Sequence, residues 1–211
     1  MLVTAGPTYE AIDPVRFIGN HSSGKMGFAI ADQLAAMGAD VTLIAGPTAQ
    51  KSHQPSVKRI DVTSAAEMLD ACLQHYKNSK ACIMCAAVAD FTPVTVSAQK
   101  IKKQDTDLNI ELKKTTDILK TLGEQKSNGQ ILVGFALETN NEEDNAVEKL
   151  KKKNLDFIVL NSLNDKGAGF RTDTNKITII DHKLQKTVFD LKDKNEVATD
   201  ICNKVAELIN T

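Results

Sequence analysis

A stretch rich in glycine and serine near the N-terminus holds the residues that could most directly do chemistry. It reads Asn20-His21-Ser22-Ser23-Gly24-Lys25-Met26-Gly27 and runs into an amphipathic pattern that ends at Gly38. The first N–H groups of a helix have no partner within the helix, and the helix dipole adds positive charge beside them. A loop of this kind therefore predicts an anion site, usually one for phosphate, in which serine and asparagine supply further donors and acceptors.

Asp90 and Lys100 could complete a site for a phosphorylated ligand. Asp90 follows the small residues Ala86 and Ala87 at the end of an apolar run, where a ligand can approach the backbone and meet a carboxylate. Lys100 lies in a run of lysines and, on an extended chain, shares a face with Lys102, so both could reach phosphate oxygens. From the spacing alone, Asp90 fits an ordinary turn equally well, and a run of lysines is typical of a solvated loop.

Three later residues have a simple structural explanation beside a functional one. Lys149 and Lys153 lie four residues apart and share one face of a predicted helix, whose last turn favours cations through the dipole. Phe135 ends an apolar run and is expected in the core, although a phenyl ring at that edge could also stack on a base.

The composition is that of an ordinary globular protein. The chain has 211 residues, of which 42% are hydrophobic and 25% charged, and we expect one domain over residues 1–211. A formal net charge of −1 gives no reason to expect nucleic acid or a membrane surface as partner. No apolar run has the length of a membrane span. The chain begins directly on an apolar strand pattern, and from this abrupt start we predict that another domain precedes it in the native protein.

The four cysteines favour a reducing compartment, the cytoplasm. Cys82 and Cys85 have the spacing of a redox or zinc pair, but both lie in an apolar strand pattern. Side chains three residues apart on a strand point to opposite faces, so the two sulfurs diverge. We therefore expect buried thiols that act as small hydrophobic groups.

Apolar runs alternate with helical patterns along most of the chain. This alternation predicts an α/β fold of Rossmann type, a mostly parallel sheet with helices on both faces. The expected strands are residues 2–5, 41–45, 58–62, 81–88, 131–136 and 157–160, and the expected helices are residues 24–37, 65–76, 117–124, 142–153 and 196–209. Alternating patterns over residues 175–180 and 186–191 predict a hairpin near the C-terminus.

Residues 91–114 depart from this rhythm. Pro93, β-branched residues and a run of lysines stand where the alternation would place a helix. Residues 92–96 and 108–112 look like two extended segments around a polar middle, and we predict a flap inserted after the fourth strand. Ligands of open α/β sheets bind outside the carboxyl ends of the strands, so a flap leaving that edge would lie over the site.

Three familiar motifs fit poorly. Residues 19–25 nearly match a Walker A loop, but Met26 stands where Ser or Thr should bind magnesium, and the loop begins far from the first strand. Gly6 lacks the following glycines of the dinucleotide fingerprint. Tyr76 and Lys80 match the tyrosine–lysine pair of short-chain dehydrogenases, but they precede the fourth strand, and a solvated helix end explains them. An NAD(P)-dependent reductase and a nucleotide-binding regulator without chemistry are kept as alternatives.

Taken together, several segments resemble one family, the phosphopantothenoylcysteine synthetases of coenzyme A biosynthesis in their bacterial, CTP-using form. Order and spacing agree over nearly the whole chain, although no single segment would suffice. The matching segments are residues 6–8, 13–18, 20–27, 86–91, 100–103, 134–140 and 149–156.

The resemblance implies a ligase reaction in two halves. The carboxylate of 4′-phosphopantothenate attacks the α-phosphate of CTP, which gives an acyl-cytidylate and pyrophosphate. The amine of L-cysteine then displaces CMP and forms an amide. In bacteria the family's domain commonly follows a flavin-dependent decarboxylase domain, so a fused decarboxylase is an expected partner.

The resemblance also implies roles for the matching residues. Asn20 and Lys100 are the expected catalytic residues: Asn20 would contact the phosphopantothenate carboxylate and stabilise the acyl-cytidylate, and Lys100 would offset charge on the phosphates. Asp90 is the expected Mg²⁺ ligand, and Arg16 would reach the partner's substrate across the two-fold axis of a homodimer. The residues expected to bind CTP are Gly6, Ser22, Gly24, Gly27, Ala86, Asp90, Lys100, Thr116, Asp117, Ile118, Leu119, Phe135, Lys149 and Lys153, and those expected to bind phosphopantothenate are Arg16, Asn20, Ala86, Ala87 and Asp90.

Overall fold

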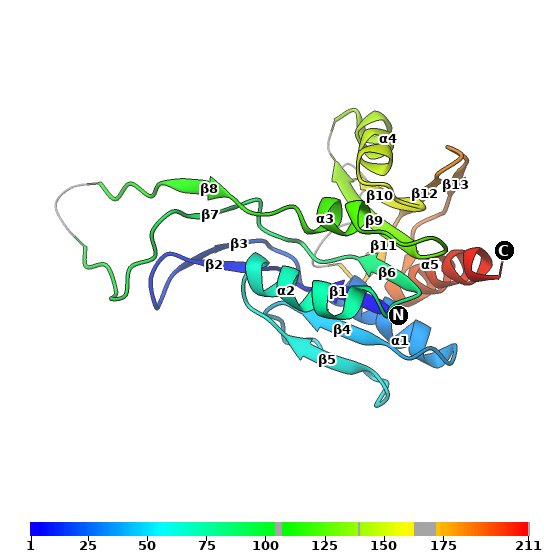
Figure 1. Ribbon diagram of the computed structural model, residues 1–211, viewed down its shortest axis with the longest axis horizontal. Coiled ribbons are helices and arrows are strands. Elements are labelled where there is room, and N and C mark those ends of the chain that lie inside the picture. Colours follow the sequence, from blue (N-terminus) through cyan, green and yellow to red (C-terminus); the bar gives the residue numbers. More distant parts are fainter. Residues whose placement is uncertain (104–106, 139, 163–171, 211) are drawn as a thin grey trace.

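An eight-stranded sheet forms the centre of the protein (Figure 1). The computed structural model describes residues 1–103, 107–138, 140–162 and 172–210. The strand order is β13-β12-β10-β9-β6-β1-β4-β5, parallel from β10 to β5, with β12 and β13 added antiparallel. These strands are β1 (Leu2–Ala5), β4 (Thr42–Ala45), β5 (Lys58–Asp61), β6 (Ala81–Met84), β9 (Ile131–Glu138), β10 (Phe157–Ser162), β12 (Ile177–Asp181) and β13 (Lys186–Val188). The predicted mostly parallel sheet with a C-terminal hairpin is confirmed.

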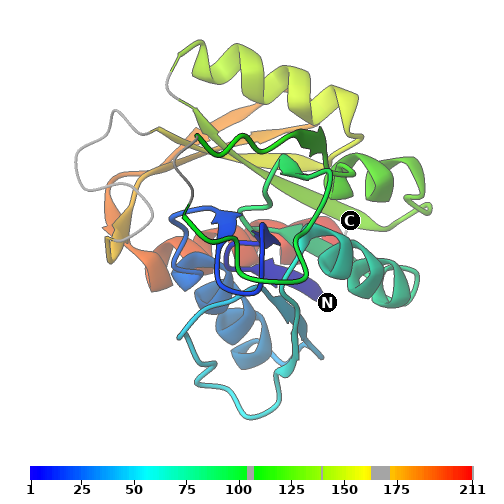
Figure 2. The same cartoon turned by 90° about the vertical axis from the view of Figure 1, so that its left-hand side faces the viewer.

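Helices cover both faces of this sheet, which explains why central strands such as β1 and β6 are apolar and buried on both sides. One core cluster joins the sheet to α1 (Lys25–Ala36) and α5 (Lys194–Ile209). A second cluster, on the other face, joins it to α2 (Ala65–Tyr76), α3 (Ile118–Glu124) and α4 (Glu142–Lys152). Figure 2 looks from the arm described below onto the body and shows α4 and α5 on different sides of the strands. Within the described residues, no helix combines the length and apolar character needed to cross a membrane.

Three of the four cysteines are buried as predicted, whereas Cys85 is only partly buried and follows the end of β6. Cys82 lies in the core cluster beneath α2, whereas Cys85 packs against the cluster on the opposite face. All four thiols are free, and three of them are fully buried. The paired spacing therefore reflects the pleat of a strand and its continuation.

The end of β6 differs from the prediction. The apolar run was expected to remain a strand as far as residue 88, but β6 ends at Met84. Beyond it, the chain bonds the end of β1 and the residue that follows: Ala86 N donates to Thr4 Oγ1 (3.1 Å), and Ala87 N donates to the Gly6 carbonyl (2.9 Å). Thr8 N in turn donates to the Ala87 carbonyl (3.2 Å), so Ala87 and Pro7 form a single parallel bridge rather than a longer strand. These bonds place small residues at the carboxyl end of the strands.

Two hairpins project from the body and together form an arm (Figure 1). The first hairpin pairs β2 (Tyr9–Ala11) with β3 (Phe17–Gly19), and the second pairs β7 (Phe91–Pro93) with β8 (Leu112–Lys114). A bond from Ser97 N to the Ile12 carbonyl (3.0 Å) joins them. The predicted flap is thus confirmed as a hairpin, although its paired strands lie nearer the body than residues 92–96 and 108–112. Residues 104–106 of the flap lie outside the described residues, and so does Thr139 of the predicted segment 134–140.

Two short elements escaped the sequence analysis. The β2–β3 hairpin has strands of three residues, too short to show an alternation, although Tyr9 stacks on Phe17 across it at 3.8 Å. A two-residue ribbon of β11 (Thr174–Asn175) and β14 (Lys192–Asp193) leads into α5. In both cases the pairing depends on tertiary neighbours rather than on local pattern.

We expect Gly123→Ala to destabilise the protein by about 1–3 kcal/mol, the usual cost of overpacking a tight contact. A Cβ at Gly123 would lie 2.0 Å from the backbone carbonyl oxygen of Lys153, at the end of α4. Urea unfolding measures the loss, and Lys120→Ala on the exposed face of α3 is the matched control, expected within about 0.5 kcal/mol of the wild type. Equal stability of both variants would show that α3 can move away from α4 without cost.

Candidate functional site

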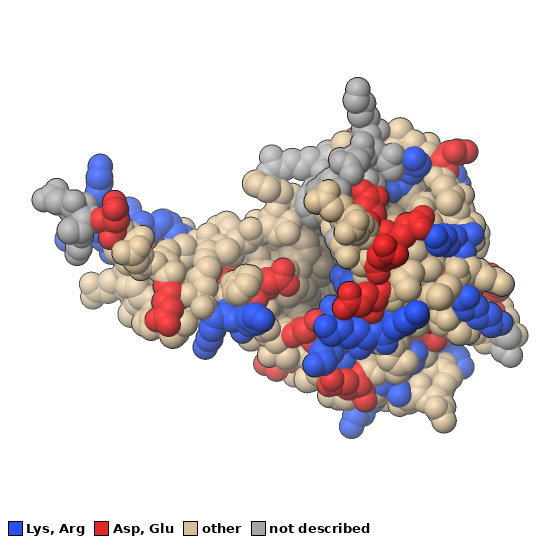
Figure 3. All heavy atoms as spheres, turned by 90° about the horizontal axis from the view of Figure 1, so that it is seen from above, with Lys and Arg blue, Asp and Glu red and all other residues tan. Residues whose placement is uncertain are grey.

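A cavity of about 730 Å³ opens at the carboxyl ends of the parallel strands, at the base of the arm. Seen from above, the surface is hollowed where the arm meets the body (Figure 3). Four segments build most of its wall: residues 20 and 22–27, residues 84–88 and 90, residues 114–119, and residues 135–137 with 149 and 153. The cavity therefore lies where the open-sheet rule placed it.

The N-terminus of α1 faces this cavity, and its first amides have no hydrogen-bond partner among the described residues. Gly24, at φ +82°, turns the chain into the helix, and no side chain caps this end in the described structure. The first intrahelical bond runs from Phe28 N to the Gly24 carbonyl (3.2 Å), so the N–H groups of residues 25–27 precede it. Ser22 and Asn20 shape the loop, because Ser22 Oγ accepts from Gly24 N (3.3 Å) and Asn20 Oδ1 accepts from Ser22 N (3.0 Å). Free N–H groups at a glycine-lined helix start are the geometry that an anion site requires, so the anion site stays a prediction that this loop can accommodate.

Lysines and backbone groups form the wall near α3 and α4. The Asp117 carboxylate caps α3, accepting from Lys120 N (2.9 Å), and pairs with Lys153 Nζ (2.8 Å). Burial acts to raise the pKa of Asp117, but the hydrogen bond from Lys153 and the other donors outweigh it and hold that pKa below the ordinary value. Lys149 Nζ donates to the Phe135 carbonyl (2.7 Å), so Lys149 and Phe135 lie next to each other in the cavity wall.

The turn before α3 is tied to the segment after β6. Thr115 N donates to the Asp90 carbonyl (2.9 Å), and Thr115 Oγ1 donates to the Ala89 carbonyl (2.7 Å). The structure therefore brings most of the predicted site residues to one cavity. The predicted residues that line it are Asn20, Ser22, Gly24, Gly27, Ala86, Ala87, Asp90, Thr116, Asp117, Ile118, Leu119, Phe135, Lys149 and Lys153.

Three predicted residues do not line the cavity. Gly6 lies behind Gly24, where a Cβ on Gly24 would be 3.3 Å from the Gly6 α-carbon, so Gly6 supports the loop rather than facing the cavity. Arg16 and Lys100 lie on the arm, Arg16 in the turn of the β2–β3 hairpin and Lys100 in the flap beyond β7. Neither contributes to the cavity of its own chain.

Sequence reasoning missed a polar end of the cavity formed by Asn161, Asn175 and Lys194. Asn161 Oδ1 is buried without a hydrogen-bond partner among the described residues. Lys194 is only 7% exposed and donates to the Thr172 carbonyl (2.6 Å); burial, and then the nearby Lys25, lower its pKa. Asn161 was detectable as a polar residue at the end of an apolar strand. The other two reach the cavity through the β11–β14 ribbon, which has no sequence signal.

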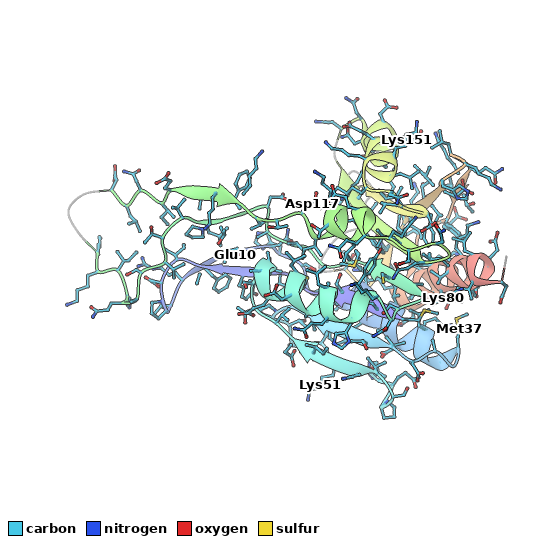
Figure 4. The ribbon with its side chains drawn as sticks, in the orientation of Figure 1. Glu10, Met37, Lys51, Lys80, Asp117 and Lys151 are labelled. Carbon is cyan, nitrogen blue, oxygen red and sulfur yellow. The ribbon has the colours of Figure 1, made fainter. Side chains whose placement is uncertain are left out.

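The residues of the reductase alternative lie elsewhere. Tyr76 is 1% exposed in the core, which also corrects the expectation of a solvated helix end. Lys80 precedes β6 and so lies at the amino edge of the sheet, away from the cavity, while Asp117 marks the cavity side (Figure 4). This tyrosine–lysine pair therefore cannot serve a ligand in the cavity. Cys85 does line the cavity, but burial raises the pKa of its thiol to about 12, so it is a neutral wall group near pH 7.

We expect Lys153→Gln to raise the pKa of Asp117, since its main stabilising donor is lost while burial persists. The lowered native pKa means that the carboxylate stabilises the wild type above the unfolded-state pKa of about 3.9, and that this contribution is lost as the pH falls. Lys153→Gln makes the native pKa of Asp117 more like the unfolded one, so the variant should lose less stability than the wild type as the pH falls. Carboxyl NMR titration measures the pKa, and Lys149→Gln, one turn away, should shift it less. Equal shifts in the two variants would contradict the pairing.

Comparison with known proteins places the chain in a family. The model of the "DNA/pantothenate metabolism flavoprotein C-terminal domain" family matches residues 1–209. "Coenzyme A biosynthesis bifunctional protein CoaBC" of Bacillus subtilis (strain 168) is 49% identical over 208 residues, which are 99% of this chain and 51% of that protein. "Cysteine/Cysteine sulfinic acid decarboxylase" of an unknown prokaryotic organism is 52% identical over 210 residues, 100% of this chain and 58% of that protein.

A solved structure supports the same grouping. The crystal structure of the C-terminal domain of coenzyme A biosynthesis bifunctional protein CoaBC has a TM-score of 0.84 at 42% identity, and the match covers 99% of this chain and 94% of that one. The chain spans little more than half the length of the curated relatives it matches. The resemblance found in the sequence is thus confirmed at the level of the family. The chain belongs to the family of the DNA/pantothenate metabolism flavoprotein C-terminal domain.

Proposed function

We propose that this domain is a CTP-dependent phosphopantothenate–cysteine ligase. The observation that carries the proposal is the pairing of two features across one cavity: the uncapped N-terminus of α1 and the lysine-bearing wall around Asp117 and Phe135. The first suits a polyphosphate, and the second offers backbone and lysine groups for a base and ribose. The match to the C-terminal domain of a bifunctional coenzyme A biosynthesis protein supports the substrate class.

The reaction asks the site for alignment and charge compensation. In the first half, a carboxylate oxygen bonds to the α-phosphorus of CTP, and the bond to the pyrophosphate oxygen breaks. In the second half, the amine nitrogen of cysteine bonds to the acyl carbon, CMP leaves with the electron pair, and the amine gives up a proton. Neither half needs an enzyme nucleophile, because CTP supplies the activation. A cavity rich in N–H donors, whose cysteine thiol is neutral, fits this demand.

Asn20 suits the acyl transfer. Its Oδ1 accepts from Ser22 N (3.0 Å), which fixes the amide and leaves Nδ2 to donate to a ligand, since Nδ2 makes no bond with the described residues. A donor held in this way can stabilise the oxyanion that forms as the amine attacks. The amides of residues 25–27 would hold the phosphates, and residues 86, 87 and 90 the phosphopantothenate.

Asp90 fits the expected magnesium ion. The described residues contain no group of three or more His, Cys, Asp or Glu that could enclose a metal. Mg²⁺ with a nucleotide commonly uses only one or two carboxylates, and phosphate oxygens and waters supply the other ligands. The exposed carboxylate of Asp90 in the cavity wall meets that need. When bound, the ion would offset negative charge on the phosphates.

The arm would form the interface with a second copy of this chain in a homodimer. Large apolar side chains are exposed along it: Val15, Phe17, Phe91, Val94, Val96, Leu108, Ile110 and Leu112. Such a patch is typical of an interface. Arg16 and Lys100 lie on this arm outside their own cavity, so in a two-fold dimer they would complete the cavity of the partner. A fused flavin-dependent decarboxylase stays a prediction, supported by the word bifunctional in the names of the relatives.

The first test is pyrophosphate release with CTP, Mg²⁺ and 4′-phosphopantothenate, with and without L-cysteine, and with ATP as the nucleotide control. We expect release that prefers CTP, and amide product only when cysteine is present. Carbon dioxide is followed in parallel with cysteine alone, because one relative is named for decarboxylation of that amino acid.

Three results would contradict the ligase. Carbon dioxide without pyrophosphate would favour a decarboxylase, and CTP binding without pyrophosphate release would favour a regulator. Binding of a reduced nicotinamide in place of CTP would favour an NAD(P)-dependent reductase.

A complementation experiment tests the shared site. Arg16→Gln alters the arm and Asn20→Asp alters the cavity, so each homodimer should turn over poorly. In mixed dimers one of the two sites would combine an intact arm with an intact cavity, and a random mixture should regain about a quarter of wild-type activity. Mixing two arm variants, Arg16→Gln and Lys100→Gln, is the matched control and should regain far less. No recovery in the first mixture would mean that each chain completes its own site.

A further inference from the structure

Among the described residues outside the cavity wall, Asp13 has the carboxylate with the most hydrogen bonds. It begins the turn of the β2–β3 hairpin, and its side chain is fully buried. Five hydrogen bonds converge on its two oxygens, from the backbone of Val15, Arg16 and Ile101 and from the Arg16 guanidinium. The proposed chemistry gives this residue no role.

The two oxygens of Asp13 have separate partners. Oδ1 accepts from Val15 N and Arg16 N, both at 2.8 Å, and so closes the turn locally. Oδ2 accepts from Arg16 Nε (3.0 Å), Arg16 Nη2 (2.5 Å) and Ile101 N (3.0 Å). One oxygen therefore shapes the turn, while the other joins the guanidinium to the flap, 88 residues further along the chain.

Arg16 closes the same network from its own side. Its Nη2 also donates to the Ile101 carbonyl (2.9 Å), so both backbone groups of Ile101 are held. Nη1 makes no hydrogen bond with the described residues, and the side chain is 42% exposed. The guanidinium is thus fixed in orientation, with one edge left to meet an anion. Lys100 precedes Ile101 directly, so its backbone is fixed by the same contacts.

We propose that Asp13 is a positioning residue that presents Arg16 and Lys100 as one rigid pair of cations to the phosphorylated substrates. The inference rests on the proposed function, since it assumes that these two residues act on the reaction. Positioned donors contribute to catalysis only if neighbouring contacts hold them within a fraction of an ångström.

The arm needs such a contact because its own strands are short. We call the hydrogen bonds from Arg16 and Ile101 to Asp13 Oδ2 the latch. Each of its four strands has three residues, and eight large apolar side chains on it are exposed. Short ladders with little burial open easily. The hydrogen bond from Arg16 opposes the effect of burial and holds the pKa of Asp13 well below its ordinary value, so the carboxylate stays charged throughout the neutral range.

Asp13→Asn tests the latch directly. Its carbonyl oxygen can still close the turn, but an NH₂ group in place of Oδ2 cannot accept from Arg16 or Ile101. We expect hydrogen exchange at Ile101 N–H, followed by NMR, to rise about tenfold or more. Ser97 N–H, which bonds the Ile12 carbonyl, should change little and reports on the integrity of the arm. Asp13→Ser, which keeps a turn-closing oxygen but cannot reach Ile101, should act in the same way.

Kinetics separate positioning from folding. We expect Asp13→Asn to lower kcat/KM for CTP-dependent pyrophosphate release about tenfold, and to cause less than a twofold further loss when Arg16→Gln and Lys100→Gln are already present. A purely structural role would give the full loss in both backgrounds. Glu111→Gln, an exposed carboxylate on the same arm, is the matched control and should match the wild type in both measurements.

Two results would overturn the proposal: unchanged exchange at Ile101, or faster exchange with unchanged kcat/KM. If the wild type releases no pyrophosphate, the ligase assignment fails instead. The exchange at Ile101 then decides alone whether the latch exists.

Discussion

The close contact between α1 and β1 is the constraint on which the candidate site depends. A Cβ on Gly27 would lie 2.6 Å from the Ala5 Cβ and 2.9 Å from the Thr4 carbonyl oxygen, so only glycine allows the helix to approach the strand this closely. Gly24 adds the left-handed turn that begins the helix, packed against Gly6. The first amides of α1, which have no partner in the described part of the chain, are therefore fixed at the edge where the parallel strands end. The other segments of the cavity wall face this helix end, which is the candidate anion site.

Two lysines of the cavity would also be stabilised by the anion that we propose. Lys25 and Lys194 occupy the first positions of α1 and α5, where the helix dipole disfavours positive charge. Asp173 partly offsets Lys25 through a 2.5 Å ion pair, but that carboxylate is largely exposed and so screened by water. Lys194 has the Thr172 carbonyl as a partner and is buried. A polyanion bound between the two helix ends would relieve both unfavourable placements, which is why a triphosphate suits this cavity better than a neutral ligand.

The sequence predicted the body of the fold well because its signals are local. Strands such as β1 and β10 are buried on both faces and read as short apolar runs, and α2 carries a capping box at Ser64 and Glu67. The glycine-rich loop was recognisable since a backbone anion site needs those residue types. Asn175 and Lys194 were not, because a two-residue ribbon brings them to the cavity from the far end of the chain. The Asp13–Ile101 contact likewise joins segments that no local pattern relates.

The arm and the body divide the proposed chemistry between them. The body holds its donors on helices and strand ends packed into two cores, so a single chain already contains the whole candidate anion site. The arm holds Arg16 and Lys100 outside that cavity and exposes an apolar surface that a second chain could cover. In the proposed dimer, burial of that surface and completion of the site are the same event. Activity would then depend on assembly, whereas nucleotide binding, which uses the body, would depend on it much less.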